Sequence, residues 1–240
     1  MAFGVKRLCV EAEAQTPELN RRHDTVFVID DDASMRESVE ALIASAGWLP
    51  ETFASAEEFL SRPRSSAPCC VVLDLMLPGL SGLEVQRRLA MRPDMPIIFI
   101  TAHTEVLTAV EAMKRGALEL LAKPFQPEAL LDAIRGALGQ SRAVVCRDAE
   151  TRMLRTCYET LTPRECDVMA LVVAGLSNKQ IGVELGISEI TVKTHRGQVM
   201  RKMNAKSLPE LVMMAVTLGL TGVTDSRGSL VLSTNAVSNS

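Results

Sequence analysis

Five polar residues in the first half of the chain could together bind a metal ion and a phosphoryl group. Each of them follows a short apolar run, and the five are Asp30, Asp31, Asp74, Thr101 and Lys123. In a parallel α/β sheet the carboxyl ends of the strands share one edge, and ligands bind along that edge. Three carboxylates, a hydroxyl and an ammonium would therefore meet in one small pocket.

The carboxylates supply the hard oxygen atoms that suit Mg²⁺, so magnesium is the expected cofactor. One carboxylate can act as a nucleophile and form an acyl phosphate. Lys123 supplies a point charge for one phosphoryl oxygen, and Thr101 can donate a hydrogen bond to another. Taken singly, these residues also have ordinary interpretations as a solvated acidic loop, a turn aspartate, a strand end and a surface lysine. Their occurrence in register after four strands favours the site.

The elements that must position these residues alternate along residues 25–138, where short apolar runs are separated by amphipathic stretches. Strands are expected at 25–30, 49–53, 69–74, 96–101 and 118–121, with helices at 34–46, 56–62, 82–91, 105–115 and 127–138. This alternation predicts a doubly wound α/β fold with a five-stranded parallel sheet. Ser34, with Glu37 three residues further on, is expected to cap the first helix.

The composition indicates a folded protein with an uneven distribution of charge. Its 240 residues suffice for one large domain or two small ones, and a hydrophobic fraction of 47% excludes wholesale disorder. Residues 25–138 carry 10 basic and 16 acidic side chains, whereas residues 188–206 carry five basic and one acidic. Nucleic acid is the expected partner of the second region.

The six cysteines show neither a C-x-x-C pair nor a spacing linked to histidine, which argues against a metal site or a disulfide framework. Cys69 and Cys70 open an apolar run and are expected to be buried as small hydrophobes. The N-terminal residues contain no apolar core of signal length, and no stretch approaches the ~18 apolar residues of a membrane span. These features predict a soluble protein of the reducing cytoplasm, with no membrane partner.

Three segments are expected to lie outside the two domains. Residues 1–24 are predicted to be a flexible extension, residues 139–160 a helical linker, and residues 223–240 a disordered tail rich in Ser, Asn and Thr.

Residues 161–222 predict a small all-helical domain, because no strand pattern is visible there. Helices are expected at 163–174, 178–185, 189–203 and 207–218. Thr162 before Pro163, with Glu165 at the third position after the cap, marks the start of the first of these helices. Ser188 is expected to cap the third helix after a tight turn at Gly186.

Residues 177–203 predict a helix, a tight turn and a second helix. An apolar stripe is expected to be buried and consists of Ile181, Leu185, Ile187, Ile190, Val192 and Val199. The opposite face of the second helix carries Lys193, Thr194, Arg196, Gly197 and Arg201. A charged stripe is often only the solvated face of a helix. However, a protein that inserts a helix into the major groove of DNA needs a short first helix to brace it across the DNA backbone.

The segments VIDDDASMRES, VVLDLMLPGLSGLEV and IIFITAHTEVLTAVEAMKRGALELLAKPF closely resemble the receiver domain of two-component response regulators, a flavodoxin-like fold, over residues 25 to about 138. The resemblance implies that Asp74 is the phosphoacceptor and that Asp31 and Asp74 bind the metal directly. It also implies that Asp30 acts on the metal through water and that the backbone carbonyl of Met76 is a further ligand.

The same resemblance implies that Thr101 is the switch hydroxyl and Lys123 its charge partner, with a cis peptide bond between Lys123 and Pro124 that would aim the lysine into the pocket. The chain departs from the family at Leu120, where an aromatic residue or histidine is usual. The aromatic swing that accompanies activation in the family has no ring to carry it here.

LTPREC, the helix-turn-helix stretch and NAKSLPELV resemble the LuxR-type DNA-binding domain from Leu161 to about Leu220. By position, Lys193, Thr194 and Gly197 are implied to face base edges, although glycine has no side chain with which to read a base. Candidates for phosphate contacts are Asn178, Lys179, Thr191, His195, Arg196 and Arg201. Residues 207–218 match the helix through which such domains pair.

Together the two halves are similar to the NarL/FixJ class, nearest its FixJ-type branch. This predicts a transcriptional regulator rather than an enzyme. A sensor histidine kinase would phosphorylate Asp74, and the resulting homodimer would bind double-stranded promoter DNA, with RNA polymerase as a further candidate partner. Two alternatives stay open: a DNA-binding regulator whose receiver works without phosphorylation, and an aspartyl phosphohydrolase.

Overall fold

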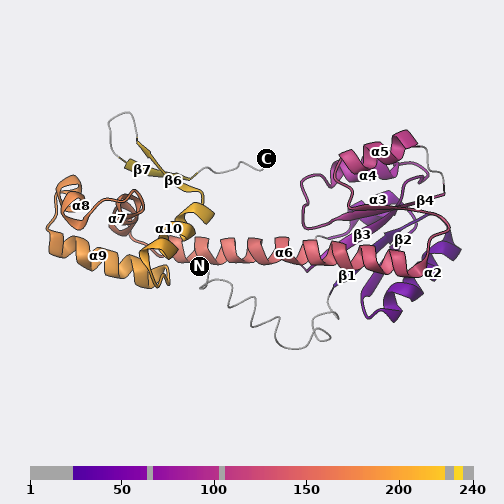
Figure 1. Cartoon of the computed structure of the whole chain (residues 1–240), viewed down its shortest axis with the longest axis horizontal. Helices are drawn as coiled ribbons and strands as arrows, with labels where there is room; N and C mark the ends of the chain where they lie inside the picture. The colour runs from indigo at the N-terminus through magenta and orange to yellow at the C-terminus, as the bar shows by residue number, and fades with distance from the viewer. Residues whose placement is uncertain (1–23, 64–66, 103–105, 225–229, 235–240) are drawn as a thin grey trace. The chain divides into compact units, whose positions relative to one another are not determined.

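The computed structural model describes residues 24–63, 67–102, 106–224 and 230–234 (Figure 1). The chain divides into two compact units, and the division falls between Arg147 and Asp148. The extension predicted for residues 1–24 lies outside the described residues except for Asp24. That residue is buried and its carbonyl accepts a hydrogen bond from the Leu49 N–H at 3.0 Å, so Asp24 belongs to the first unit.

The first unit is built on a five-stranded parallel sheet with the order β2-β1-β3-β4-β5, which confirms the predicted fold class. Its strands are β1 (Thr25–Ile29), β2 (Leu49–Phe53), β3 (Cys69–Asp74), β4 (Ile97–Thr101) and β5 (Glu119–Ala122). Strands β1 and β3 are buried throughout, and they are apolar except for Thr25 at the start of β1 and Asp74 at the end of β3, as expected for a sheet covered on both faces. Cys69 and Cys70 are buried and free, as predicted.

Helices cover both faces of this sheet (Figure 1). They are α2 (Ala33–Ser45), α3 (Ala56–Ser61), α4 (Gly82–Arg88), α5 (Val106–Lys114) and α6 (Pro127–Glu159). Because side chains alternate along a strand, Phe27 and Val71 pack toward α3, α4 and α5, whereas Val26 and Val72 pack toward α2 and α6. The cap of α2 is Asp32, whose side chain accepts the backbone N–H groups of Ser34 and Met35. The predicted Ser34 cap is therefore wrong, because the cap lies two residues earlier and Ser34 is already inside the helix.

Helix α6 is much longer than the helix expected at 127–138, and the first unit continues past the predicted boundary. The Ser141 hydroxyl accepts the Cys69 N–H at 2.9 Å and donates to the Asp94 carbonyl at 2.5 Å. Arg142 forms an ion pair with the buried Asp24. These contacts fix the helix to the sheet beyond residue 138, and the segment predicted as a linker is helical throughout up to Glu159.

Four helices follow α6 in the described part of the second unit, and all are close to their predicted ranges. They are α7 (Pro163–Val173), α8 (Asn178–Leu185), α9 (Glu189–Lys202) and α10 (Leu208–Thr217). Thr162 and Glu165 form the expected capping box, and Ser188 caps α9. Gly186 ends α8 with φ of 64°, a left-handed conformation that glycine adopts without steric cost.

A hairpin follows these helices and contradicts part of the predicted disordered tail. Strands β6 (Leu220–Thr224) and β7 (Leu230–Thr234) pair antiparallel, with Leu220 opposite Thr234. The two runs contain Val and Thr, β-branched residues that favour extended backbone, and pairing satisfies backbone hydrogen bonds of both runs. The surrounding Ser and Asn residues hid this signal in the sequence. Residues 225–229 and 235–240 lie outside the described residues.

Candidate functional site

The acidic pocket forms where four strands of the first unit end. Asp74 and Thr101 are the last residues of β3 and β4, while Asp30 directly follows β1 and Lys123 directly follows β5. Strands β1, β3, β4 and β5 are successive neighbours in the sheet, so the fold brings these residues to one edge. The predicted juxtaposition of the pocket residues is therefore present in the structure.

Lys123 is the centre of the pocket, because its ammonium bridges two carboxylates. Nζ donates to Asp30 Oδ2 and to Asp74 Oδ2, each at 2.6 Å. The Asp30 side chain is fully buried, and the side chains of Asp74 and Lys123 are 8% and 14% exposed. Burial lowers the pKa of Lys123, but the hydrogen bonds to Asp30 and Asp74 raise it, and the net pKa lies above that of a free lysine. The ammonium is held in its charged form, and one cation is shared by two anions.

The second oxygen of each buried carboxylate is held by the backbone. Asp74 Oδ1 accepts the Met76 N–H at 2.9 Å, and Asp30 Oδ1 accepts the Asp32 N–H at 2.9 Å. Arg36 Nη1 donates to the Asp30 carbonyl at 2.6 Å. Both carboxylates are thus fixed in orientation before any ligand arrives.

A metal ion would find a suitable set of oxygen atoms here. Asp30, Asp31 and Asp74 each offer a carboxylate oxygen, and these atoms lie within 4.8 Å of one another. Asp31 is exposed, so the cluster opens to solvent on its side. Three carboxylates against one ammonium leave the pocket with an excess of negative charge, which a divalent cation with a preference for oxygen would neutralise. The donor set fits Mg²⁺.

Thr101 and Leu120 lie on neighbouring strands beside this pocket. Thr101 is fully buried, and its carbonyl accepts the Lys123 N–H at 2.8 Å. Leu120 is opposite Phe99 in the register of β4 and β5, and its half-buried side chain packs on the core beneath α3, α4 and α5. The Lys123–Pro124 peptide bond is cis, as the resemblance implied.

Gly82 supports the pocket and was not singled out in the sequence. A Cβ atom at this first residue of α4 would lie 2.6 Å from the Asp74 carbonyl oxygen and 3.0 Å from the Leu75 Cα. The Gly82 N–H also donates to the Leu75 carbonyl at 3.1 Å. Only glycine allows the helix to approach strand β3 so closely. The available signal was a glycine directly after the helix cap Ser81.

The second unit contains the expected helix-turn-helix, but its buried stripe differs from the predicted one. Ile181, Val192 and Val199 are buried, and Leu185 and Ile187 are partly buried against the same core. Ile190 is 77% exposed, so its predicted burial is wrong. Ile190 lies three residues before Lys193 and four before Thr194, and both of these are exposed. The helical period therefore places Ile190 on the same exposed face.

The predicted DNA-contacting residues divide into an exposed set and a half-buried set. Lys179, Lys193, Thr194, Gly197 and Arg201 are exposed, whereas Asn178, Thr191, His195 and Arg196 are half-buried. Two of the basic side chains in residues 188–206 bind residues of other helices, whereas Lys193 and Arg201 have partners on α9 itself, Glu189 and Gln198. Lys202 Nζ donates to Glu165 Oε2 at 2.6 Å, and the Arg196 guanidinium donates to Asn178 Oδ1.

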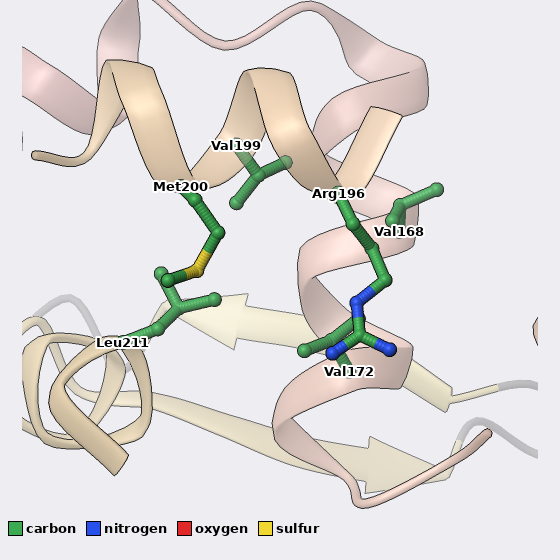
Figure 2. A pocket seen from close by; sticks show the side chains of 6 residues that line it. All are labelled: Val168, Val172, Arg196, Val199, Met200 and Leu211. Atoms are coloured by element: carbon green, nitrogen blue, oxygen red, sulfur yellow. The ribbon is translucent and has the colours of Figure 1, made fainter. Parts of the chain in front are cut away.

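Arg196 therefore braces α9 against α8. Its side chain lines a small hollow with apolar side chains from α7, α9 and α10, as Figure 2 shows, and these are Val168, Val172, Val199, Met200 and Leu211. Lys193 is less constrained, because its Nζ lies 3.3 Å from Glu189 Oε1 and both side chains are at least half exposed. The charge available to a partner on α9 is carried mainly by Lys193 and Arg201.

Comparison with known proteins matches each unit to a family. Residues 26–135 match the response regulator receiver domain, and residues 159–215 match the bacterial regulatory proteins of the luxR family. Nodulation protein W of Bradyrhizobium diazoefficiens is 47% identical over 196 residues, covering 81% of this chain and 86% of that protein. The transcriptional regulatory protein FixJ of the same species is 41% identical, covering 81% and 96%.

A solved structure of the response regulator StyR has 45% sequence identity and a TM-score of 0.72, with 81% of this chain and 98% of that chain covered. Within the part of the chain that the structure describes, none of the helices has the length and apolar character needed to cross a membrane.

Proposed function

This chain belongs to the two-component response regulators of the FixJ type, which join a receiver domain to a LuxR-type DNA-binding domain, and we propose that phosphorylation of Asp74 by a sensor histidine kinase switches its action on promoter DNA. The observation that carries this proposal is the arrangement around Asp74. Its carboxylate lies at the end of β3, held by Lys123 and by the Met76 N–H, beside the acidic residues Asp30 and Asp31.

The transfer step needs an unprotonated carboxylate and a site that tolerates added negative charge. One carboxylate oxygen of Asp74 attacks the phosphorus of the kinase phosphohistidine, the P–N bond breaks as the P–O bond forms, and the histidine leaves. Lys123 compensates part of the charge that the phosphoryl oxygens bring into the pocket. Mg²⁺, when bound, supplies further positive charge at these oxygens. It would be held by Asp31, Asp74 and the Met76 carbonyl, with Asp30 acting through water.

The switch that follows would begin at Thr101. Its hydroxyl would donate to a phosphoryl oxygen, and the shift of β4 would reach Leu120 on the adjacent strand. Leu120 has no ring to rotate into the core, so a change in its rotamer would report the phosphorylated state in place of the aromatic swing.

The output would be promoter binding by a homodimer in the cytoplasm. Helix α10 exposes the apolar side chains of Met213 and Val216, which supports its use in pairing. Paired domains would place two copies of α9 in successive major grooves, about one helical turn of DNA apart. Lys193, Thr194 and Gly197 would face base edges, and Asn178, Lys179, Thr191, His195, Arg196 and Arg201 would lie near the phosphates. RNA polymerase is the proposed further partner at such a promoter.

The proposal is tested with Asp74→Asn and the control Asp132→Asn, which removes an exposed carboxylate on α6. Radiolabel transfer from a phosphorylated histidine kinase domain should be lost in Asp74→Asn and retained in Asp132→Asn. Activation of DNA binding by the kinase should disappear with the label. Undiminished labelling of Asp74→Asn would overturn the assignment.

A second candidate is a regulator whose receiver acts without phosphorylation, and the aliphatic Leu120 at the switch position is the observation that favours it. The two candidates differ in the response to beryllofluoride, which mimics the phosphoryl group. Promoter affinity at one fixed salt concentration should rise with beryllofluoride in the first case and stay unchanged in the second.

A further inference from the structure

We propose that Ile190 is a specificity residue that recognises the C5-methyl group of a thymine in the major groove. The inference rests on the proposed placement of α9 in that groove, and it adds a residue that the family positions did not assign to DNA. Ile190 was expected to be part of the buried stripe, and the structure instead places it on the outer surface of the helix-turn-helix.

The exposure of Ile190 is unusual within its own helix. Its side chain is 77% exposed, whereas the other β-branched apolar residues of α9, Val192 and Val199, are 0% and 1% exposed. Single exposed apolar residues are common on protein surfaces and need no explanation by themselves. The position of Ile190 relative to the proposed base-facing residues is what gives this one a function.

Ile190 lies on the same face of α9 as Lys193 and Thr194, because residues three and four apart are neighbours on a helix. The Thr194 hydroxyl donates to the Ile190 carbonyl at 3.1 Å, which links the two residues directly. That bond uses the hydroxyl proton inside the helix, so Thr194 has its methyl group and oxygen lone pairs left for contacts with a partner.

The next turn of the helix leaves this face open. A Cβ atom built on Gly197 would meet nothing within 4 Å, so no side chain projects there to hold α9 away from a partner surface. Ile190 is in the first turn of α9, and the N-terminal residues of a recognition helix are those that contact base edges. The face therefore offers an apolar side chain, a cation and a small hydroxyl residue to the floor of the groove.

The chemical groups in the major groove indicate which base an exposed isoleucine would contact. Among the base edges in the major groove, the thymine C5-methyl is the apolar group, and the remaining groups are hydrogen-bond donors or acceptors. Ile190 has no polar atom in its side chain, so contact with a donor or acceptor would desolvate that group without replacing its hydrogen bond. Contact with a methyl group removes apolar surface of both partners from water.

The test uses the full-length chain treated with beryllofluoride and a binding site obtained by selection from random duplexes. Each thymine of the site is replaced in turn by deoxyuridine, which lacks only the C5-methyl group. The wild-type chain should lose about three- to tenfold in affinity at one thymine of each half-site. Ile190→Ala should bind both duplexes equally, and Ile190→Val should keep part of the discrimination.

Val183→Ala is the matched control, because Val183 on α8 is 80% exposed and equally apolar. This variant should keep the full sensitivity to deoxyuridine. Equal affinity of the wild-type chain for every substituted duplex, or unchanged discrimination in Ile190→Ala, would overturn the inference while leaving the proposed function intact. Failure of the wild-type chain to select any sequence would overturn the proposed function and the inference together.

Discussion

The receiver pocket and helix α9 both carry charged side chains, but the surroundings of these charges differ. In the pocket, Lys123 is paired with two carboxylates at 2.6 Å, and all three side chains are largely shielded from solvent. On α9, Lys193 is 62% exposed and lies 3.3 Å from a single glutamate that is itself half exposed. The cation of the pocket is paired internally, whereas Lys193 on the helix stays accessible to a partner.

The difference follows from what surrounds each cation. A buried ammonium must have partners in place, because an unpaired buried charge is very costly. An exposed lysine is solvated by water and makes only a weak, salt-screened ion pair, which a phosphate or a base can replace at little cost. The pocket thus suits a signal input, because added charge would disturb the existing ion pairs of Lys123. Helix α9 suits an output, because its exposed lysine can form new contacts.

Both regions also rely on a glycine that permits close packing beneath them, and the largest expected effect comes from filling one of these positions. A Cβ at Gly182 would lie 2.8 Å from the Ile187 carbonyl oxygen in the turn between α8 and α9. Gly182→Ala should destabilise the second unit by about 2–3 kcal/mol, because the obstructing atom is backbone and cannot rotate away. Calorimetric unfolding of the full chain, together with DNA affinity, measures this loss.

Gly197→Ala is the control for that experiment, because its added methyl meets nothing within 4 Å. This substitution in the middle of α9 should stabilise the helix by about 0.5–1 kcal/mol. An equal loss of stability in both variants would show that the tight approach at Gly182 is not what holds the turn.

A smaller effect is expected from removing the pocket cation. Lys123→Met should bind Mg²⁺ about tenfold more tightly, equivalent to about 1.4 kcal/mol, because the ammonium no longer competes for Asp30 and Asp74. The same variant should take up the phosphoryl label more slowly. Calorimetric titration with Mg²⁺ checks the first expectation, and Lys114→Met, which removes an exposed cation on α5, should leave the affinity unchanged. Weaker Mg²⁺ binding by Lys123→Met would contradict the competition.

The smallest effect concerns a second, structural ion pair that lies in the DNA-binding unit. Glu165 Oε2 accepts from Lys202 at 2.6 Å and from the Thr162 N–H at 2.7 Å, and the bond from Lys202 is the main reason that the pKa of Glu165 is lowered. Stability from a carboxylate with a lowered pKa is present above about pH 4.3, the ordinary value for glutamate. It is lost as the pH falls through the lowered value of the folded state.

Glu165→Gln should therefore destabilise the unit by about 1 kcal/mol at pH 7 and should match the wild-type chain in strong acid. Thermal unfolding followed from pH 7 to pH 3 measures the difference. Glu84→Gln is the control, because the pKa of Glu84 is lowered by its hydrogen bond to Arg87 on the surface of α4, where solvent screens the pair. A pH-independent loss in Glu165→Gln would show that the ionised form of Glu165 contributes nothing.

The sequence predicted the receiver pocket well because strand ends carry a strong local signal. Asp30, Asp74, Thr101 and Lys123 each follow an apolar run, and the parallel sheet leaves a single edge where such residues meet. The N-caps of α7 and α9 at Thr162 and Ser188 were predicted correctly for a similar reason, since capping depends on residues only three positions apart.

The residues that the sequence placed wrongly depend on contacts between distant segments or on one turn of helical phase. Ile190 is apolar and was expected to be buried, but it lies on the outer face. The β6–β7 hairpin pairs two short runs that carry no decisive signal singly. Ser141 stabilises the sheet from a segment predicted as linker, because its partners Cys69 and Asp94 are remote in sequence.

The sequence by itself therefore determined the two domain types, the polar residues at the ends of the strands and the family. Those features follow from local periodicity, from caps and from residue types at strand ends, which need no knowledge of distant contacts. Only the tertiary structure decided how the groups are paired. It assigned Lys123 to two carboxylates, withdrew Arg196 and Lys202 into internal contacts, and left Ile190 outside. Pairing and exposure depend on which side chains the folded chain brings within a few ångströms of each other, and a linear pattern does not contain that information.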